Sequence, residues 1–350
     1  MKNQLPDFHQ MHFDSIQALR GVTALFIVLE HVRFLNCGAF GVDIFFCISG
    51  FMIMFSTHGG GRHFLGKRLI RILPLYYMMT AGTFLLLLLF PGMFEQTRAN
   101  PVFLLKSLLF IPFDIGGGTI QPLLRIGWTV NCEIFFYILF MIAMRISHRF
   151  RGLLCGLFLA GFVAMAHLAP APCAFLAFYG NPVMLEFIFG MLCYYVSWGL
   201  YRRHQAGRLP GFFGTAGILG LLAGFFGLLV TKRTVNVLGF LRPLRWGLPT
   251  MLMVLCAFLV GLCHDHGQNR KTPSPFVRLG DISFSLYLVH YYPVMALDRF
   301  VFDFSAPSPR AFFGVAVAFA VSICLAVISW ALIERRLSDY LRRKLLAASK

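Results

Sequence analysis

Long apolar segments alternate with short polar ones along the whole chain. Ten segments of about 17–23 residues are each long enough to cross a bilayer as an α-helix. They cover residues 15–33, 39–57, 72–90, 127–145, 152–168, 181–201, 211–230, 246–263, 282–299 and 311–332. A shorter apolar run, Val102–Phe113, contains Lys106 and Pro112 and predicts an interfacial or re-entrant piece. The pattern therefore predicts an all-α, polytopic membrane protein of about ten helices.

Composition supports this prediction. The chain has 350 residues, of which 58% are hydrophobic and only 13% are charged, a balance too apolar for a soluble globular protein. We therefore expect residues 1–350 to form a single membrane-embedded domain with no soluble domain. Ten crossings place both termini on the same side.

The net charge of +17 would suit a nucleic-acid partner, but its distribution indicates a membrane instead. With the N-terminus in the cytoplasm, about two thirds of the 31 lysine and arginine residues fall in cytoplasmic segments, as the positive-inside rule predicts. The basic tail, residues 335–350, belongs to this set. One outer loop, with Lys232, Arg233, Arg242 and Arg245, is an exception that indicates either an anionic-ligand patch or a wrong topology there.

The first apolar segment contains ionisable residues, which are rare inside a bilayer and usually functional. Arg20 and His31 are eleven residues apart, which puts them about 20° from eclipsed on one helix face and about 16 Å apart along the axis. Glu30 lies about 80° off the face of Arg20. In the second segment, Asp43 should lie at the depth of His31. A carboxylate beside an imidazole makes a general base, and a purely structural ion pair is the alternative.

A basic cluster precedes the third segment. Lys67, Arg68 and Arg71 share one helix surface, and Pro74 is predicted to start the membrane span that follows. Arginine binds phosphate groups bidentately, so the cluster suits a phosphorylated ligand. The alternative is a topology signal or a lipid headgroup anchor.

Further polar side chains lie within the apolar segments. Candidates for binding an acceptor or supporting the site are Trp128 and Tyr137 in the fourth segment, Glu186 in the sixth, and Ser283, Tyr287 and His290 in the ninth. Asn131 and Glu133 are buried polar residues of the fourth segment. Glu133 needs a partner at this depth. Ser283, Tyr287 and His290 form a stripe at i, i+4 and i+7, for which hydrogen bonding between helices is the alternative. The cysteines and histidines show no metal-ligand spacing, so no metal is expected.

Three function classes remain open on these residues alone. The first is an enzyme with His31 as a base. The second is a proton-coupled transporter or flippase of a lipid-linked sugar, with Arg20, Glu30, Asp43, Glu133 and Glu186 as a relay, although no inverted repeat supports it. The third is a non-catalytic subunit of a polysaccharide synthase.

A series of motifs in order resembles the membrane-bound acyltransferase-3 family. They are LRGVTALFIVLEHV, GVDIFFCISGFMI, KRLIRILPLYY, WTVNCEIFFY, LEFIFGM, GDISFSLYLVHYYP and ALIERRL, and they run from residue 18 to residue 337. The chain looks most similar to the branch that acetylates bacterial exopolysaccharides. It departs from the family pattern at Thr129, where many members have Ser, and at Phe284, where the block often has Tyr.

The resemblance implies a ten-helix bundle in the bacterial inner membrane. Such an enzyme transfers an acyl group, usually acetyl, from cytoplasmic acyl-CoA to a hydroxyl of an extracytoplasmic polysaccharide or its lipid-linked precursor. Acetyl-CoA would be a donor substrate rather than a resident cofactor, and polysaccharide-assembly proteins are expected partners beside membrane lipids. In this scheme His31 is catalytic, with Arg20 and Glu133 beside it, and Asp43 joins them through the pairing with His31 expected above. Lys67, Arg68 and Arg71 bind the phosphates of coenzyme A.

Overall fold

The computed structural model describes residues 7–61, 63–93, 97–208, 210–231, 239–264 and 274–347. Lys232 and Arg233 of the predicted outer basic loop lie outside these ranges. Within them the secondary structure is helical apart from one isolated bridge between Asp114 and Ile120. The α-helices are α1 (Asp14–Glu30), α2 (Gly41–Ser56), α3 (Phe64–Leu89), α4 (Pro101–Leu108), α5 (Trp128–Ile146), α6 (Arg151–Leu168), α7 (Ala174–Tyr179), α8 (Glu186–Gln205), α9 (Phe212–Thr231), α10 (Leu248–His264), α11 (Pro275–Asp281), α12 (Ser283–Val289), α13 (Tyr291–Phe300), α14 (Pro309–Ser329) and α15 (Ser338–Ala347).

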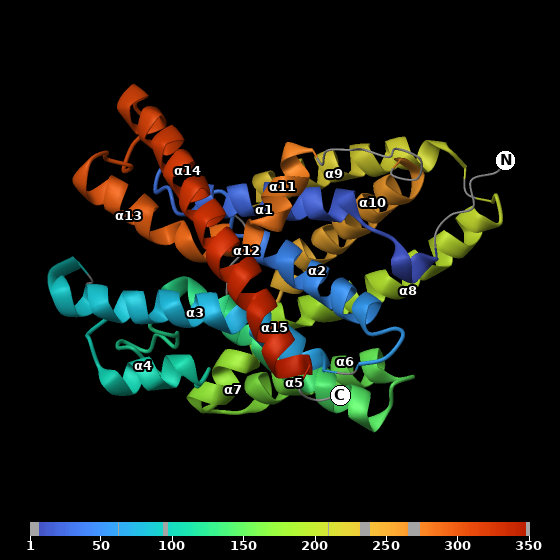
Figure 1. Cartoon of the computed structure of the whole chain (residues 1–350), viewed down its shortest axis with the longest axis horizontal. Helices are drawn as coiled ribbons and strands as arrows, with labels where there is room; N and C mark the ends of the chain where they lie inside the picture. The colour runs from blue at the N-terminus through green and yellow to red at the C-terminus, as the bar shows by residue number, and fades with distance from the viewer. Residues whose placement is uncertain are drawn as a thin grey trace.

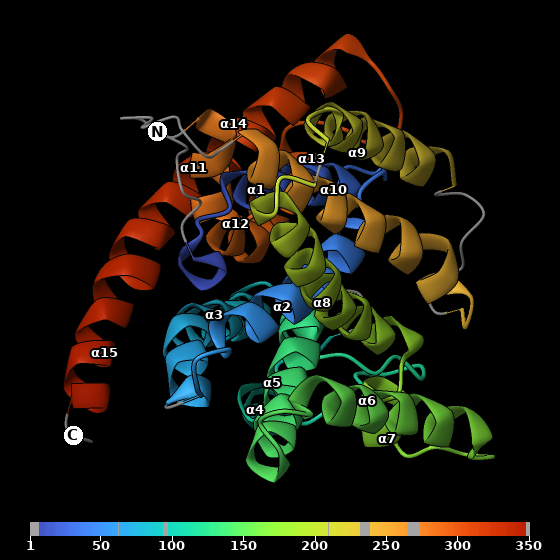
Figure 2. The same cartoon turned by 90° about the vertical axis from the view of Figure 1, so that its right-hand side faces the viewer.

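The all-α, polytopic membrane architecture is confirmed. Seven helical stretches of the described chain are long and apolar enough to span a membrane, and α2 is a shorter apolar helix. Each of the ten predicted segments falls on a helix or on a pair of consecutive helices. Figures 1 and 2 show these helices packed around α2, α1 and α12, with α3, α4 and α5 on one side and α9 and α10 on the other.

Helix α3 begins at Phe64, so the basic cluster lies on a helix surface as predicted, and Pro74 lies inside the same helix. One predicted segment, by contrast, is broken, and a proline is involved. The ninth segment is interrupted at His290, which separates α12 from α13. Pro293 has no amide hydrogen for the carbonyl of Val289, so a continuous helix would leave that acceptor without its partner. Helix α4 covers eight residues, about 12 Å, and is too short to span a bilayer.

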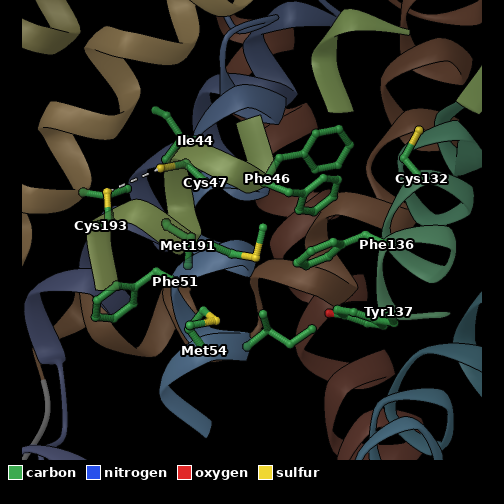
Figure 3. Close-up of a cluster of buried hydrophobic side chains, with 14 of the residues drawn as sticks. Ile44, Phe46, Cys47, Phe51, Met54, Cys132, Phe136, Tyr137, Met191 and Cys193 are labelled. Atoms are coloured by element: carbon green, nitrogen blue, oxygen red, sulfur yellow. Dashed lines mark hydrogen bonds between the residues drawn. The ribbon is translucent and has the colours of Figure 1, made fainter. Parts of the chain in front are cut away.

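Helix α2 is held by close packing against α8. A Cβ atom on Gly190 would overlap the backbone carbonyl of Cys47, and one on Gly50 would overlap that of Phe187. Gly190 and Gly50 therefore allow the two helix backbones to approach closely. Figure 3 shows aromatic and sulfur-containing side chains beside this contact, where the Cys47 and Cys193 sulfur atoms lie 4.0 Å apart. This packing fixes α2, and both ends of α2 reach the cavities described below.

Helix α14 continues through a π-helical segment, Trp330–Leu337, into α15. In Figure 1 these elements form one long red helix that crosses in front of α12 and α3. Both the π-helical segment and α15 contact α3. The C-terminal end of the described chain is therefore part of the folded bundle.

Candidate functional site

Three cavities follow one another from one end of α2 to the other. The first, the basic pocket, has an empty volume of about 590 Å³ and is lined by Lys67, Arg68, Arg71 and Arg342 among others. The second, the central cavity, measures about 930 Å³ and shares Arg68 and Arg71 with the first. The third, the histidine cavity, measures about 1770 Å³. It contains His31 and shares its lining with the central cavity at two residues, which are discussed below.

In the basic pocket, α3 presents its three cations on one surface, so the predicted clustering of Lys67, Arg68 and Arg71 is confirmed. Arg68 donates to the Ser56 hydroxyl over 2.8 Å. Arg71 lies 3.6 Å from Glu334, its one carboxylate neighbour within ion-pair distance among the described residues. The pocket therefore carries a net positive charge.

The central cavity contains Arg20 and Glu133. The Arg20 guanidinium donates to Gln17 over 3.1 Å and to Ser283 over 3.0 Å. No carboxylate in the described ranges lies within 4.0 Å of it, so its charge is balanced only at longer range. Glu133 accepts hydrogen bonds from Ser49, over 3.0 Å, and from Tyr137. Glu133 therefore has the partners that an acid at this depth needs.

In the histidine cavity, His31 contacts a second histidine. Its Nδ1 atom lies 2.9 Å from the Ile27 carbonyl oxygen and 3.1 Å from Nε2 of His290. Nδ1 of His290 lies 3.0 Å from the Leu286 carbonyl oxygen. A carbonyl only accepts, so Nδ1 of each neutral ring carries its proton, and Nε2 of His290 accepts from His31.

This arrangement fixes the tautomer of His31. With the proton on Nδ1, the lone pair of His31 is on Nε2, which makes no hydrogen bond to any of the described residues. His290 is completely buried, so it holds this geometry out of contact with water. A neutral imidazole with a free Nε2 lining a large cavity can accept a proton from a bound hydroxyl.

The predicted pairing of Asp43 with His31 is wrong. Both oxygens of Asp43 accept from Arg242, over 3.0 Å to Nε and 2.6 Å to Nη2. Asp43 is fully buried and the Arg242 side chain is 3% exposed. The two residues are 199 positions apart, and a bidentate arginine satisfies the carboxylate more completely than a single imidazole nitrogen would.

Glu186 belongs to the same buried cluster. One of its oxygens lies 4.0 Å from Arg242, and its side chain is fully buried. Glu30 accepts from the backbone amides of Gly38 and Ala39 and so holds the turn between α1 and α2. The five residues suggested as a proton relay are therefore distributed among three separate groups, in the central cavity, the Asp43 cluster and this turn.

A thin wall separates the central cavity from the histidine cavity. Val42 and Tyr287 line both. The Tyr287 hydroxyl donates to the Ile126 carbonyl over 2.8 Å and accepts from Thr129 over 2.7 Å, which fixes the ring in place. Arg20 lies on α1 and His31 caps the C-terminal end of this helix, and the two side chains open into different cavities.

Each member of the polar stripe on the ninth segment bonds to another helix. Ser283 accepts from Arg20, Tyr287 bonds to Ile126 and Thr129, and His290 contacts His31. These bonds connect different helices, as the structural alternative supposed. Ser283 and Tyr287 nevertheless line the central cavity, and Tyr287 and Trp128 line the histidine cavity.

Sequence reasoning missed three site residues. Arg125 lines the histidine cavity and its charge acts on the His31 ring, but its position in a loop gave no signal. Arg342 lines the basic pocket although the tail was interpreted only as a topology signal. Arg242 was noted only as one of the cations in an outer loop that departs from the positive-inside rule. That departure was the available signal, because Arg242 is there to pair with the buried Asp43.

The chain is an all-helical membrane bundle with a cationic pocket at one end of α2 and a histidine pair at the other. A family model described as an acyltransferase domain matches residues 13–329. The chain therefore belongs to the acyltransferase-3 family and is a membrane O-acyltransferase, as the sequence motifs predicted.

Three relatives are similar over most of this chain. "Exopolysaccharide production protein ExoZ" of Rhizobium meliloti (strain 1021) is 28% identical over 86% of this chain and 89% of that protein. "Putative peptidoglycan O-acetyltransferase YrhL" of Bacillus subtilis (strain 168) is 26% identical over 93% of this chain, which spans 55% of that longer protein. "Putative membrane-bound transacylase BcsY" of Komagataeibacter xylinus is 25% identical over 95% and 85%, respectively. No solved structure matches the chain.

Proposed function

We propose that this protein transfers an acetyl group from cytoplasmic acetyl-CoA to a hydroxyl of an extracytoplasmic or lipid-linked polysaccharide. The observation that carries the proposal is the sequence of three cavities with shared walls, basic at one end and containing His31 at the other. The names of two relatives, an exopolysaccharide production protein and a peptidoglycan O-acetyltransferase, support a glycan acceptor.

The donor would enter at the basic pocket. Coenzyme A carries about four negative charges at pH 7, on its diphosphate and 3′-phosphate, and cannot cross a bilayer unaided. Lys67, Arg68 and Arg71 supply the complementary charge. The uncharged pantetheine arm would extend past Arg68 and Arg71 into the central cavity, which is lined mainly by apolar side chains.

Arg20 then has a guiding role. Arg20 lines the central cavity and lies about 16 Å along the helix axis from His31. This distance is too long for Arg20 to stabilise charge on the thioester carbonyl group while His31 acts on the attacking hydroxyl. Its guanidinium, held by Gln17 and Ser283, would donate to an amide carbonyl of the pantetheine arm. The thioester would pass the wall at Val42 to reach the histidine cavity.

The transfer step uses His31 as a general base. Its Nε2 takes the proton of the acceptor hydroxyl as the hydroxyl oxygen bonds to the thioester carbonyl carbon. The resulting oxyanion collapses, the carbon–sulfur bond breaks, and the proton on Nε2 passes to the departing thiolate. The products are the acetyl ester and free coenzyme A. Arg125, a cation in the same cavity, would stabilise the oxyanion.

An acyl-histidine intermediate on Nε2 would use the same geometry, and a trapped acetyl group on His31 would identify it. The arrangement requires the basic pocket to face the cytoplasm and the histidine cavity to face outward, in the bacterial inner membrane. Polysaccharide-assembly proteins that supply the acceptor are the expected partners.

The test compares the surface glycans of a deletion strain with those of the strain that carries the gene. We expect mass spectrometry to find that glycans of the deletion strain are lighter by about 42 Da for each acetyl group that is replaced by hydrogen. Glycans identical in both strains under conditions where the protein is expressed would refute the proposed acceptor class.

A further inference from the structure

The C-terminal helix α15 contributes to the basic pocket. Arg342 on α15 lines this pocket together with the three cations of α3. The residues are more than 270 positions apart in the sequence, yet they face one space of about 590 Å³. The tail therefore does more than mark membrane topology.

Side chains spaced four residues apart attach the tail to α3. Glu334 lies 3.6 Å from Arg71, and the buried Ser338 hydroxyl donates to the Ile70 carbonyl oxygen over 3.0 Å. Ser338 and Arg342 are separated by four residues on α15 and share a face. The contact at Ser338 thus places Arg342 at the basic pocket.

Four cations around one pocket repel one another. Ser56 is a hydroxyl neighbour of Arg68, and Glu334 is the one carboxylate within 4.0 Å of any of the four in the described ranges. A ligand with several negative charges would convert this repulsion into attraction. The pocket thus suits a phosphate monoester and a diphosphate better than a single carboxylate.

We infer that Arg342, with Lys67, binds the 3′-phosphate of coenzyme A, so that α15 completes the donor site. The inference rests on the proposed donor and follows from the order of the cavities. Arg68 and Arg71 line both the basic pocket and the central cavity, so they meet the diphosphate next to the pantetheine arm. Lys67 and Arg342 line only the basic pocket, where the 3′-phosphate, at the end of the donor away from the thioester, would lie.

The experiment measures acetyl transfer by the purified full-length protein with two donors, acetyl-CoA and acetyl-3′-dephospho-CoA. For Arg342→Ala we expect the KM for acetyl-CoA to rise about tenfold, the size of one lost charge-assisted hydrogen bond. The KM for the dephospho donor should change by less than about twofold. Arg342→Lys should recover part of the difference. The matched control is Arg343→Ala, an exposed cation of α15 that does not line the pocket.

The outcomes separate the two proposals. No transfer from either donor to any glycan by the wild-type protein would refute the proposed function. Normal transfer with equal KM increases for both donors in Arg342→Ala would refute the role of Arg342 alone. An anionic lipid headgroup has the same phosphate chemistry, so both proteins are also assayed in vesicles of neutral lipid and of neutral lipid mixed with phosphatidylglycerol. A defect that appears only with phosphatidylglycerol, for both donors, would overturn the inference in favour of the lipid.

Discussion

Replacing Arg242 by methionine should destabilise the protein far more than a surface change would. Arg242 holds Asp43 through two hydrogen bonds of 3.0 and 2.6 Å and lies 4.0 Å from Glu186, and all three side chains are buried. Removing the cation leaves two buried carboxylates without their partner, which costs about 3–5 kcal/mol. In a thermal unfolding assay in detergent this corresponds to a fall in Tm of about 4–7 °C for a chain of 350 residues.

The triple variant Asp43→Asn, Glu186→Gln and Arg242→Met removes all three charges together. We expect it to recover most of the lost Tm, because no charge remains buried alone. Glycan acetylation per folded molecule should also recover substantially, since the His31–His290 contact is separate from this cluster. The reasoning would be refuted if Arg242→Met kept the wild-type Tm, or if the triple variant regained Tm but transferred no acetyl group.

Further substitutions at His290, Arg68, Arg71 and Val42 test the cavities and the histidine pair. His290→Phe should lower kcat about two- to tenfold at unchanged KM values, because Nδ1–H of His31 loses a hydrogen bond that contributes roughly 0.5–1.5 kcal/mol. His290→Gln should be less affected, and equal losses in both variants would contradict the tautomer argument. Arg68→Ala and Arg71→Ala should each raise the KM for acetyl-CoA about tenfold and leave that for the acceptor unchanged, and equal changes in both constants would indicate a structural role. Val42→Phe should abolish transfer while coenzyme A still binds by calorimetry, because the thioester must pass this wall; wild-type transfer rates would show that the donor takes another route.

The helices could be predicted from the sequence because hydropathy and length are local properties. The interruption at His290 could not be predicted, because the sequence does not say whether a proline will break a helix. Helix α3 continues through Pro74, whereas the helix is interrupted close to Pro293. Which outcome occurs depends on the neighbouring helices that satisfy the freed carbonyl.

The candidate site was predictable as far as local spacing extends. The pairs Glu133–Tyr137 and Ser283–Tyr287 share faces because residues four apart must do so on a helix. The partner of Asp43 was assigned incorrectly because equal depth does not decide which of several neighbours a side chain contacts. Arg242 approaches from a distant helix, and only the packed structure reveals it.

Acetyl transfer by His31→Ala is the most direct test of the proposed chemistry. Purified wild-type and variant proteins, matched by Tm and by binding of coenzyme A, are given radiolabelled acetyl-CoA and the glycan identified by mass spectrometry. The variant should bind the donor normally and transfer label about 10²–10⁴-fold more slowly than the wild type, the range that a positioned base supplies. Transfer at the wild-type rate by folded His31→Ala would contradict the assignment of His31 as the base.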